Sequence, residues 1–468
     1  MHWIDLLIIC LFLGGFSTYG IWQSKFNLSS DDYFLAGRTL PWPVAMLSIV
    51  ATETSVLTFI SVPGLAYRGD WTFLQLSMGY IIGRIFVSIF LLPQYFKYGI
   101  SSIYEILGKK FGKDIQKVAS SIFLITRILA DGVRFLATAV IVQLITGWSL
   151  PFSVLIIGLV TLIYTLNGGI RTVVLVDSVQ FMLYLVGGVL SIIIIWNYLN
   201  QPISSLIMQL SEGSKLSIIN FEGNFFKDPF FALSAIIGGM LLSFSSHGVD
   251  YMMVQRVLGT KNLKSAQKAM IGSGIVVFVQ FLIFLIAGSL IYILMEGAQL
   301  DNDREFTTFI INYLPIGIKG ILLAGVLSAA MSTLSSSINS LSSSIITDWM
   351  GGNKSIKKSQ LVGFICGLVL ILIALLFDES DSAIVIVGLQ IASFTYGGLL
   401  GLFLLSRFKT NFHNSSLICG LIFSFLIVFY LKSIELPWTW FIAFSVIVNI
   451  IVTILYESVF RNVKSWKS

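Results

Sequence analysis

A run of hydroxyl side chains, Ser328–Ser344, has the most unusual chemistry for its surroundings, because it lies in an apolar stretch long enough to cross a bilayer. If the run is helical, its polar residues on one face are Ser328, Ser332, Ser335, Ser336, Asn339 and Ser343. Unpaired polar groups are costly in lipid, so this Ser ladder either packs against other helices or lines a binding site. Small Ser residues are typical of close packing between membrane helices, and the stretch taken alone favours packing.

Two other features extend the same chemistry. The polar cluster Ala51–Ser55 interrupts an apolar run, and Asp177 lies inside another, with no Lys or Arg one turn away on its hydrophobic side. An interrupted helix releases backbone carbonyls, and a hard cation such as Na⁺ binds several oxygen atoms rather than nitrogen or sulfur. Hydroxyls, carbonyls and one carboxylate therefore have the composition of a sodium site. A lone buried carboxylate such as Asp177 needs a cation or must stay protonated.

Further ionisable residues lie within apolar runs, where such groups are functional candidates. They are Glu53, Arg84, Arg127, Asp131, Arg134 and Asp250. The spacing of Arg127, Asp131 and Arg134 allows all three to pair on one helix face, which favours a structural role for at least two of them. For Glu53 and Arg84, a binding role and a structural role both stay open.

The composition is that of a polytopic membrane protein, with 56% hydrophobic and 11% charged residues over 468 positions. Soluble domains carry about 25% charged residues. The sequence has no transition-metal cluster, no nucleotide-binding loop and no hydrolytic triad. We therefore expect no enzyme, no nucleic-acid partner and no nucleotide partner, so that transport is passive or draws on an ion gradient.

Thirteen apolar runs of bilayer length predict an all-α fold with about 13 transmembrane helices. They cover residues 3–22, 41–67, 71–96, 115–146, 150–167, 173–199, 230–255, 267–295, 316–347, 359–377, 382–406, 413–431 and 437–457. The second and seventh runs are interrupted by polar residues, and an offset of five spans inverts the seventh relative to the second. This layout predicts a 5+5 inverted repeat with two discontinuous helices.

The predicted organisation follows from these runs. It comprises a peripheral helix and cytoplasmic loop (1–40), a first five-helix repeat (41–199), an extracellular loop (200–229) with a short interfacial helix, a second, inverted repeat (230–407), and two peripheral helices with a short cytoplasmic tail (408–468). Lys and Arg, Arg256 among them, concentrate in the loops of one side, which places the N-terminus outside and the C-terminus in the cytoplasm. We expect a multi-pass protein in the lipid bilayer of the cell membrane, with a monomeric functional unit.

Several stretches resemble the sodium:solute symporter family, which includes sodium–glucose, proline, pantothenate and sialic acid transporters. They are DDYFLAGRTLPWPVAMLSIVATETSVLTFISVPGLAY, SIYEILGKKFG, YTLNGGIRTVVLVDSVQ, DYMMVQRVLGTKNLKSAQ and the Ser ladder. The resemblance covers about residues 31–407. It implies the inverted-repeat fold first seen in a bacterial leucine transporter, and a sodium-driven symporter that imports a small polar organic solute by alternating access.

The resemblance also implies two sodium sites. The first takes backbone carbonyls at the first broken helix, and a carbonyl and two hydroxyls on the Ser-rich helix; the matching residues are Ala51, Thr54, Ala329, Ser332 and Thr333. The second, nearer the cytoplasm in some members, matches Asp177, Ser332, Ser335 and Ser336. The end of the ladder is assigned to helix packing, namely Ser340, Ser342, Ser343 and Ser344.

Solute contacts carry over by position to the two interrupted helices and their neighbours. The implied residues are Glu53, Ser55, Thr58, Phe73, Ser77, Ser243, Ser246, His247, Asp250 and Gln390. Where sialic acid transporters use an Arg to hold the solute carboxylate, this chain has Ala130, and His247 stands where sugar transporters often have Trp. The solute class therefore stays open between a sugar, sialic acid or another organic acid, and a polyol or nucleoside.

Two alternatives to a sodium symporter stay open from the sequence. A proton-coupled transporter of the same fold would use Asp177 or Glu53 as its titrating group, and its uptake would follow pH rather than Na⁺. A membrane solute sensor or channel is the alternative outside transport. We expect no soluble output domain after Tyr456, which disfavours a sensor.

Overall fold

The computed structural model describes residues 2–26, 29–54, 56–301, 304–352, 355–376 and 384–465. The side chains of some helical residues are outside this description: Phe26, Val56, Leu57, Ala137, Ile141, Leu144, Ile145 and those of 384–393 and 460–465. Throughout the described ranges the regular structure is helical, apart from one parallel bridge between Leu40 and Thr260. The all-α prediction is confirmed for these residues.

The helices of the first half enclose the first predicted interruption. They are α1 (Trp3–Gln23), α2 (Ser30–Leu35), α3 (Trp42–Glu53), α4 (Val56–Arg68), α5 (Phe73–Phe86), α6 (Leu92–Tyr98), α7 (Glu105–Phe111), α8 (Lys113–Thr146), α9 (Leu150–Leu199) and α10 (Ile203–Glu212). The short helix expected within 200–229 is α10. The runs predicted at 150–167 and 173–199 belong to one 50-residue element, which departs from helical geometry at Gly169.

The helices of the second half enclose the second interruption and the Ser ladder. They are α11 (Ala232–Val249), α12 (Tyr251–Leu258), α13 (Leu263–Leu294), α14 (Glu305–Tyr313), α15 (Ile318–Ser344), α16 (Ile356–Leu376), α17 (Ile384–Leu405), α18 (Asn414–Ser433) and α19 (Phe441–Ser465). Within the described chain, nine helices are long and apolar enough to cross a membrane, or ten if the bent pair α3 and α4 forms one span. The protein is therefore a multi-pass membrane protein.

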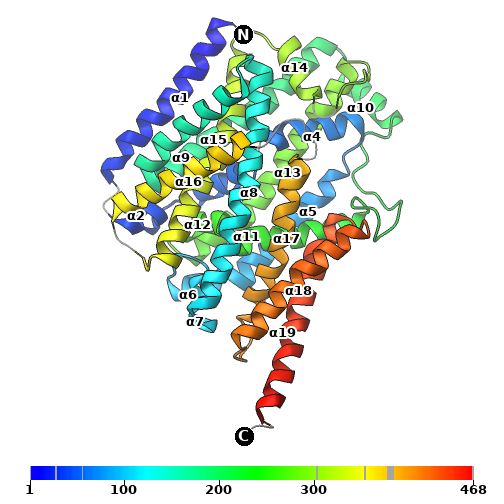
Figure 1. The fold of residues 1–468 in the computed structure, drawn as a ribbon. Coiled ribbons are helices and arrows are strands. Elements are labelled where there is room, and N and C mark those ends of the chain that lie inside the picture. Colours follow the sequence, from blue (N-terminus) through cyan, green and yellow to red (C-terminus); the bar gives the residue numbers. More distant parts are fainter. Residues whose placement is uncertain are drawn as a thin grey trace.

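The helix that carries the Ser ladder, α15, runs through the middle of the bundle (Figure 1). Every residue from Leu322 to Ser344 is buried, and α15 packs against α1, α8, α9 and α16. Small Ser, Ala and Gly side chains permit this enclosure because they let neighbouring backbones approach closely. Asp5 of α1 accepts hydrogen bonds from the N–H groups of Gly317 (2.8 Å) and Gly320 (2.9 Å), so it caps the start of α15. The ladder is thus held on all sides by protein.

Glycines bring α5 and α11 into direct backbone contact. A Cβ atom at Gly79 would lie 2.3 Å from the carbonyl oxygen of Ile236, and one at Gly83 would lie 2.3 Å from that of Met240. A larger residue at either position would force the helices apart. This contact places the end of α5 beside the last turns of α11, where the second interruption begins.

The two ends of the bundle carry different short elements. The N-terminus, α10 and α14 lie at one end, whereas α6, α7 and the C-terminus lie at the other (Figure 1). After α10, the Lys215 ammonium donates to the carbonyl of Tyr67 (2.8 Å) and lies 3.8 Å from the centre of the Tyr292 ring. Burial lowers the pKa of Lys215 from its ordinary value. The loop that follows α10 is thereby attached to the end of α4.

Candidate functional site

The first interruption separates α3 from α4. Thr54 is extended (φ −75°, ψ 109°), and the axes of the two helices differ by 67°. The Thr54 N–H makes the last bond of α3, to the carbonyl of Val50 (2.8 Å). Carbonyls in the last turn of a helix have no intrahelical partner, so the break offers backbone oxygens from Ala51 onward. The predicted residue Ser55 lies outside the described residues.

The Ser ladder lies against this break. The Thr52 hydroxyl is 3.2 Å from the Ser336 hydroxyl, which links α3 directly to α15. Ser332 is fully buried, and its Oγ has no hydrogen-bond partner in the described part of the chain. Nearby on the same helix, Ala329 and Thr333 keep 7% and 6% of their surface exposed. The structure therefore brings together the two helices that carry the first predicted set of sodium ligands.

A glutamine that the sequence analysis did not select supports the break. Gln280 of α13 is fully buried, and its Oε1 accepts a hydrogen bond from the Thr54 hydroxyl (2.9 Å). Its amide nitrogen donates to the Tyr184 hydroxyl (3.2 Å). Gln280 thereby fixes the side chain of the residue at which α3 ends. A glutamine in the middle of an apolar run was the available signal.

The cation that Asp177 requires comes from a distant helix, α12. Arg256 was expected in a cytoplasmic loop, but its side chain is fully buried and lies 3.5 Å from the Asp177 carboxylate. Its guanidinium also donates to Ser48 (3.0 Å) and to the ladder residue Ser336. Arg256 belongs to α12, which is buried along its whole length. Because α12 is far from Asp177 in the sequence, the residues around Asp177 do not reveal this partner.

The second predicted set of sodium ligands is therefore shared with a guanidinium. Ser48 Oγ donates to Asp177 Oδ2 at 2.9 Å, the oxygen that faces Arg256. The other carboxylate oxygen, Asp177 Oδ1, is buried without a hydrogen-bond partner among the described residues. Ser335 donates to the carbonyl of Ser332 (3.0 Å). Ser332 also lies within reach of the Asp177 carboxylate, so the two groups without a well-formed hydrogen bond among the described residues, Asp177 Oδ1 and Ser332 Oγ, are close to each other.

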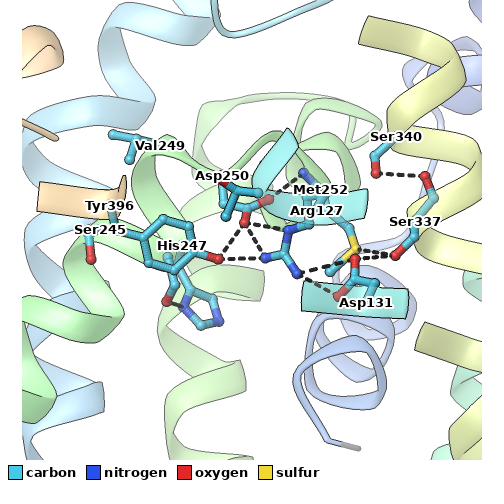
Figure 2. A network of polar contacts seen from close by, with 12 residues as sticks. Arg127, Asp131, Ser245, His247, Val249, Asp250, Met252, Ser337, Ser340 and Tyr396 are labelled. Atoms are coloured by element: carbon cyan, nitrogen blue, oxygen red, sulfur yellow. Dashed lines mark hydrogen bonds and ion pairs between the residues drawn. The ribbon is translucent and has the colours of Figure 1, made fainter. Parts of the chain in front are cut away.

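The second interruption lies between α11 and α12, at Asp250. This residue is extended (φ −92°, ψ 114°), and its carboxylate accepts from the N–H of Met252 (2.9 Å), which caps α12. Figure 2 shows the same carboxylate against Arg127 of α8 and Tyr396 of α17; it accepts from Arg127 Nε at 2.7 Å and from the Tyr396 hydroxyl at 2.6 Å. Asp250 therefore joins four helices at the break.

The predicted pairing along α8 forms within this network. Arg127 lies 3.1 Å from Asp131, and Arg134 lies 3.6 Å from the same carboxylate. Asp131 also accepts a hydrogen bond from Ser337 of the ladder (Figure 2). Arg127, Asp131 and Asp250 are all buried to 2% exposure or less. Two guanidiniums and two carboxylates consequently balance one another, and of the four side chains Arg134 is partly exposed, at 15%.

A second charged cluster joins α3, α5 and α11. Glu53, the last residue of α3, forms an ion pair with Arg84 and lies 3.6 Å from His247 Nε2. The Arg84 guanidinium also donates to Ser273 (2.6 Å) and Ser243 (3.4 Å). The Arg84 side chain is fully buried, whereas that of Glu53 is 20% exposed. A carboxylate at the first break thus stays accessible although its charge is paired.

Comparison with known proteins decides the family. The family model "Sodium:solute symporter family" matches residues 33–423. The chain belongs to the sodium:solute symporter family. This symporter is accordingly a relative of sodium-coupled membrane transporters and not of enzymes.

Two full-length relatives show the range of the similarity. The sodium/sialic acid symporter SiaT of Proteus mirabilis is 27% identical over 91% of this chain and 88% of its own. The sodium/glucose cotransporter of Vibrio parahaemolyticus is 22% identical over 93% of this chain and 86% of its own. Both alignments extend across the two breaks.

Solved structures give the same fold. A Na⁺-coupled sialic acid symporter, in a substrate-bound outward-open state described as having a novel Na⁺ site, superimposes with a TM-score of 0.89 at 25% identity. The match covers 97% of this chain and 98% of that one. The nucleobase–cation transporter Mhp1 shares the fold at a TM-score of 0.61 and 13% identity.

The residues implied as solute contacts in this symporter fall into separate groups. Glu53, Ser243, Ser246 and His247 lie in the Arg84 cluster, and Asp250 lies in the Arg127 network. Ser77 is fully buried and donates to the carbonyl of Leu74 in its own helix (2.8 Å), whereas the Phe73 ring packs 5.1 Å from that of Phe281. Thr58 is half-buried on α4, and the side chain of Gln390 lies outside the described residues.

Proposed function

We propose that this symporter uses the Na⁺ gradient to import a small polar organic solute by alternating access. The observation that carries the proposal is the contact of the first broken helix with the Ser ladder, from Thr52 to Ser336, one turn from the buried Ser332 hydroxyl, which has no well-formed hydrogen bond among the described residues. A buried polar atom without a partner is costly, so it marks a place where a ligand supplies the missing interaction. Hydroxyl, carbonyl and carboxylate oxygens of α3, α9 and α15 lie near this place, and oxygen atoms are the ligands that a hard cation prefers.

The first proposed sodium site lies between α3 and α15. Carbonyls of Ala51, Thr54 and Ala329 and hydroxyls of Ser332 and Thr333 would supply its ligands. Thr333 Oγ1 donates to the Ala329 carbonyl at 3.3 Å, so two of these oxygens already lie side by side. The broken helix holds these backbone oxygens in place inside the bundle, so no separate loop within the membrane is needed.

The second proposed sodium site uses Asp177, Ser332, Ser335 and Ser336. The Arg256–Asp177 separation of 3.5 Å is longer than the 2.7–2.9 Å typical of a charge-assisted hydrogen bond, and Asp177 Oδ1 has no partner in the described structure. This carboxylate therefore has capacity for a second cation. A sodium ion would share Asp177 with Arg256, and the two cations would repel each other, so this site would be weaker than the first.

We propose solute binding between the two breaks. Glu53, Ser243, Ser246 and His247 would contact the solute, together with Ser55, Thr58, Phe73, Ser77, Asp250 and Gln390 as the positions that match the family. Sodium at the first site would join α3 to α15 and favour the outward-open state, because an ion shifts a conformational equilibrium by binding one state more tightly. Release to the cytoplasm would follow when α12 and α17 move away from α8.

The proposed architecture has 13 spans in a 5+5 inverted repeat, with repeats at 41–199 and 230–407. The N-terminus would face outward and the C-terminus the cytoplasm. The termini at opposite ends of the bundle support an odd number of spans (Figure 1). We further propose the cell membrane as its location and a monomer as the functional unit.

Reconstitution tests the proposed function. Purified full-length protein in proteoliposomes should take up a solute when an inward Na⁺ gradient is imposed, and a K⁺ gradient of equal size should give no uptake. Uptake that follows an imposed pH gradient in the absence of Na⁺ would instead support a proton-coupled transporter. Flux that does not saturate with solute would support a channel.

The second sodium site has its own variant. Asp177→Ala should lower the apparent Na⁺ affinity or the coupling ratio, because it removes the one carboxylate of that site. Asp177→Asn is the matched variant that keeps the shape of the side chain and removes its charge. Na⁺-dependent uptake that is unchanged in both variants would remove the second site from the proposal.

A further inference from the structure

The charged residues next to the breaks carry information about the solute itself. Four Arg side chains lie near the two breaks, and each has an acidic partner within the described structure: Arg84 with Glu53, Arg127 with Asp250 and Asp131, Arg134 with Asp131, and Arg256 with Asp177. The carboxylates and guanidiniums are equal in number. The side chains next to the breaks therefore carry no surplus positive charge of their own.

A solute carboxylate beside Glu53 would need a cation at this position. To bind it there, the protein would have to take Arg84 away from Glu53, which leaves Glu53 without its cation. Breaking a buried ion pair on one side is strongly destabilising. An anionic solute would also approach the Glu53 side chain, which is the accessible carboxylate of the cluster at 20% exposure. Both effects disfavour an acid.

A positively charged solute is disfavoured by the same cluster. Glu53 is already neutralised by Arg84, whose guanidinium is fully buried and held by Ser273 and Ser243. An amine that paired with Glu53 would therefore approach a fixed guanidinium of like charge. The electrostatics consequently favour a solute without net charge at this position.

An independent observation shows what the solute should offer instead. His247 is 1% exposed, its Nδ1 lies 2.9 Å from the Ser246 hydroxyl, and its Nε2 has no hydrogen-bond partner among the described residues. The distance of 3.6 Å from Nε2 to Glu53 is too long for a hydrogen bond. A carboxylate only accepts hydrogen bonds, whereas a hydroxyl both donates and accepts. A hydroxyl group is therefore the group that can satisfy both residues.

From this cluster we infer that the solute is a neutral, hydroxyl-rich molecule, a sugar or polyol. Its hydroxyl groups form hydrogen bonds with Glu53 and His247. This inference rests on the proposed function. This assignment separates the chain from those relatives whose names specify sialic acid, which is an acid. Glu53 and His247 belong to the first and the second broken helix respectively, so the same contacts connect the solute to both moving parts.

Matched solutes test this inference without any variant. The thermal stability of the purified full-length protein is measured in Na⁺ and in K⁺ with D-galactose, D-galacturonate and D-galactosamine, and with D-glucose, D-glucuronate and D-glucosamine. Myo-inositol and N-acetylneuraminate complete the panel. A ligand that binds the native state raises the apparent melting temperature. In Na⁺, at least one neutral solute should raise it, and the acid and the amine of the same ring should not.

The contrary results separate the inference from the proposed function. An acid or amine that raises the melting temperature as much as its neutral counterpart would overturn the inference and leave sodium symport standing. A melting temperature that rises with Na⁺ but with none of the neutral solutes would also overturn the inference and leave sodium symport standing. No difference between Na⁺ and K⁺, with or without solute, would overturn the proposed function itself.

A substitution at Glu53 should shift the predicted preference for a neutral solute toward the acid of the same ring. Glu53→Gln leaves Arg84 without its anion, so the apparent affinity for the neutral solute should fall at least about tenfold while the acid of the same ring gains relative to it. Ser342→Ala is the matched control, because the Ser342 hydroxyl donates to the Asn339 carbonyl of its own helix (3.0 Å) and is not among the proposed ligands or solute contacts. An unchanged order of neutral and acid solutes in Glu53→Gln would contradict the role of Glu53.

Discussion

The two helix breaks of this protein are built in opposite ways. At the first, between α3 and α4, the last carbonyls of α3 have no intrahelical partner, and the Ser332 hydroxyl of the neighbouring helix α15 has no well-formed hydrogen bond among the described residues. At the second, between α11 and α12, the Asp250 carboxylate is already bonded to Arg127, Tyr396 and the Met252 N–H. The first break has unsatisfied oxygens, whereas the Asp250 carboxylate at the second break is satisfied by the protein itself.

This difference indicates different roles for the two breaks. Unsatisfied oxygens at the first break suit an ion that arrives and leaves in each cycle, because the ion completes interactions that the protein lacks. The satisfied charges at the second break hold α8, α12, α15 and α17 together, and they must separate before that end of the bundle can open. We thereby assign sodium binding and the closure of this end of the bundle to different groups of residues.

The largest expected effect on stability comes from removing the buried carboxylate at the second break. Asp250→Asn removes the charge partner of Arg127, and we expect destabilisation of about 3–5 kcal/mol, the usual cost of leaving one member of a buried ion pair alone. Thermal unfolding in detergent measures the loss, and uptake should disappear. Arg134→Gln is the comparison, since Arg134 is 15% exposed and its contact with Asp131 is longer. Equal destabilisation by both variants would contradict the network.

An intermediate effect is expected from Gln280→Leu, which alters the first break without substituting a proposed ligand. The Thr54 hydroxyl loses its acceptor, and a buried hydroxyl without a partner costs about 1–3 kcal/mol. If Gln280 positions Thr54 for sodium, the apparent Na⁺ affinity should fall as well. Tyr184→Phe removes only the far hydrogen bond of Gln280 and should leave Na⁺ affinity unchanged. A loss of stability with a wild-type Na⁺ affinity would limit Gln280 to a structural role.

The smallest effect is expected from Lys215→Met, at the far end of α4. The substitution removes the bonds of the ammonium to the carbonyls of Tyr67 and Gly69 but also removes the cost of burying an amine. We expect a stability change within about 1 kcal/mol and no change in the Na⁺ midpoint. A shifted Na⁺ midpoint would mean that the first break is controlled from the end of α4 and not at Thr54.

Much of the architecture could be predicted from local sequence. Apolar run length located the helices, and polar residues inside two of those runs located both breaks, because each break needs groups that satisfy an interrupted backbone. The pairing of Arg127 with Asp131 followed from helical spacing. Each of these features depends on residues that are close together in the chain.

The partners of the buried charges could not be predicted in this way. Asp177 is bonded to Arg256, and Asp250 to Arg127 and Tyr396, across 79, 123 and 146 positions. Spacing along one helix carries no information on such pairs, since they depend on how separate helices are arranged around α15. Arg256 was assigned to a loop because it directly follows the apolar run that ends at residue 255, whereas Tyr396 and Gln280 lie within apolar runs.

The central claim is that sodium binds between the first break and the Ser ladder. Its most direct test is a titration of thermal stability with Na⁺, against K⁺, for the wild type, Ser332→Ala and Ser342→Ala. We predict that Na⁺ alone stabilises the wild type, that the Na⁺ midpoint rises at least about tenfold in Ser332→Ala, equivalent to about 1.4 kcal/mol, and that Ser342→Ala matches the wild type. Identical Na⁺ midpoints in all three proteins, or equal stabilisation by K⁺, would contradict the claim.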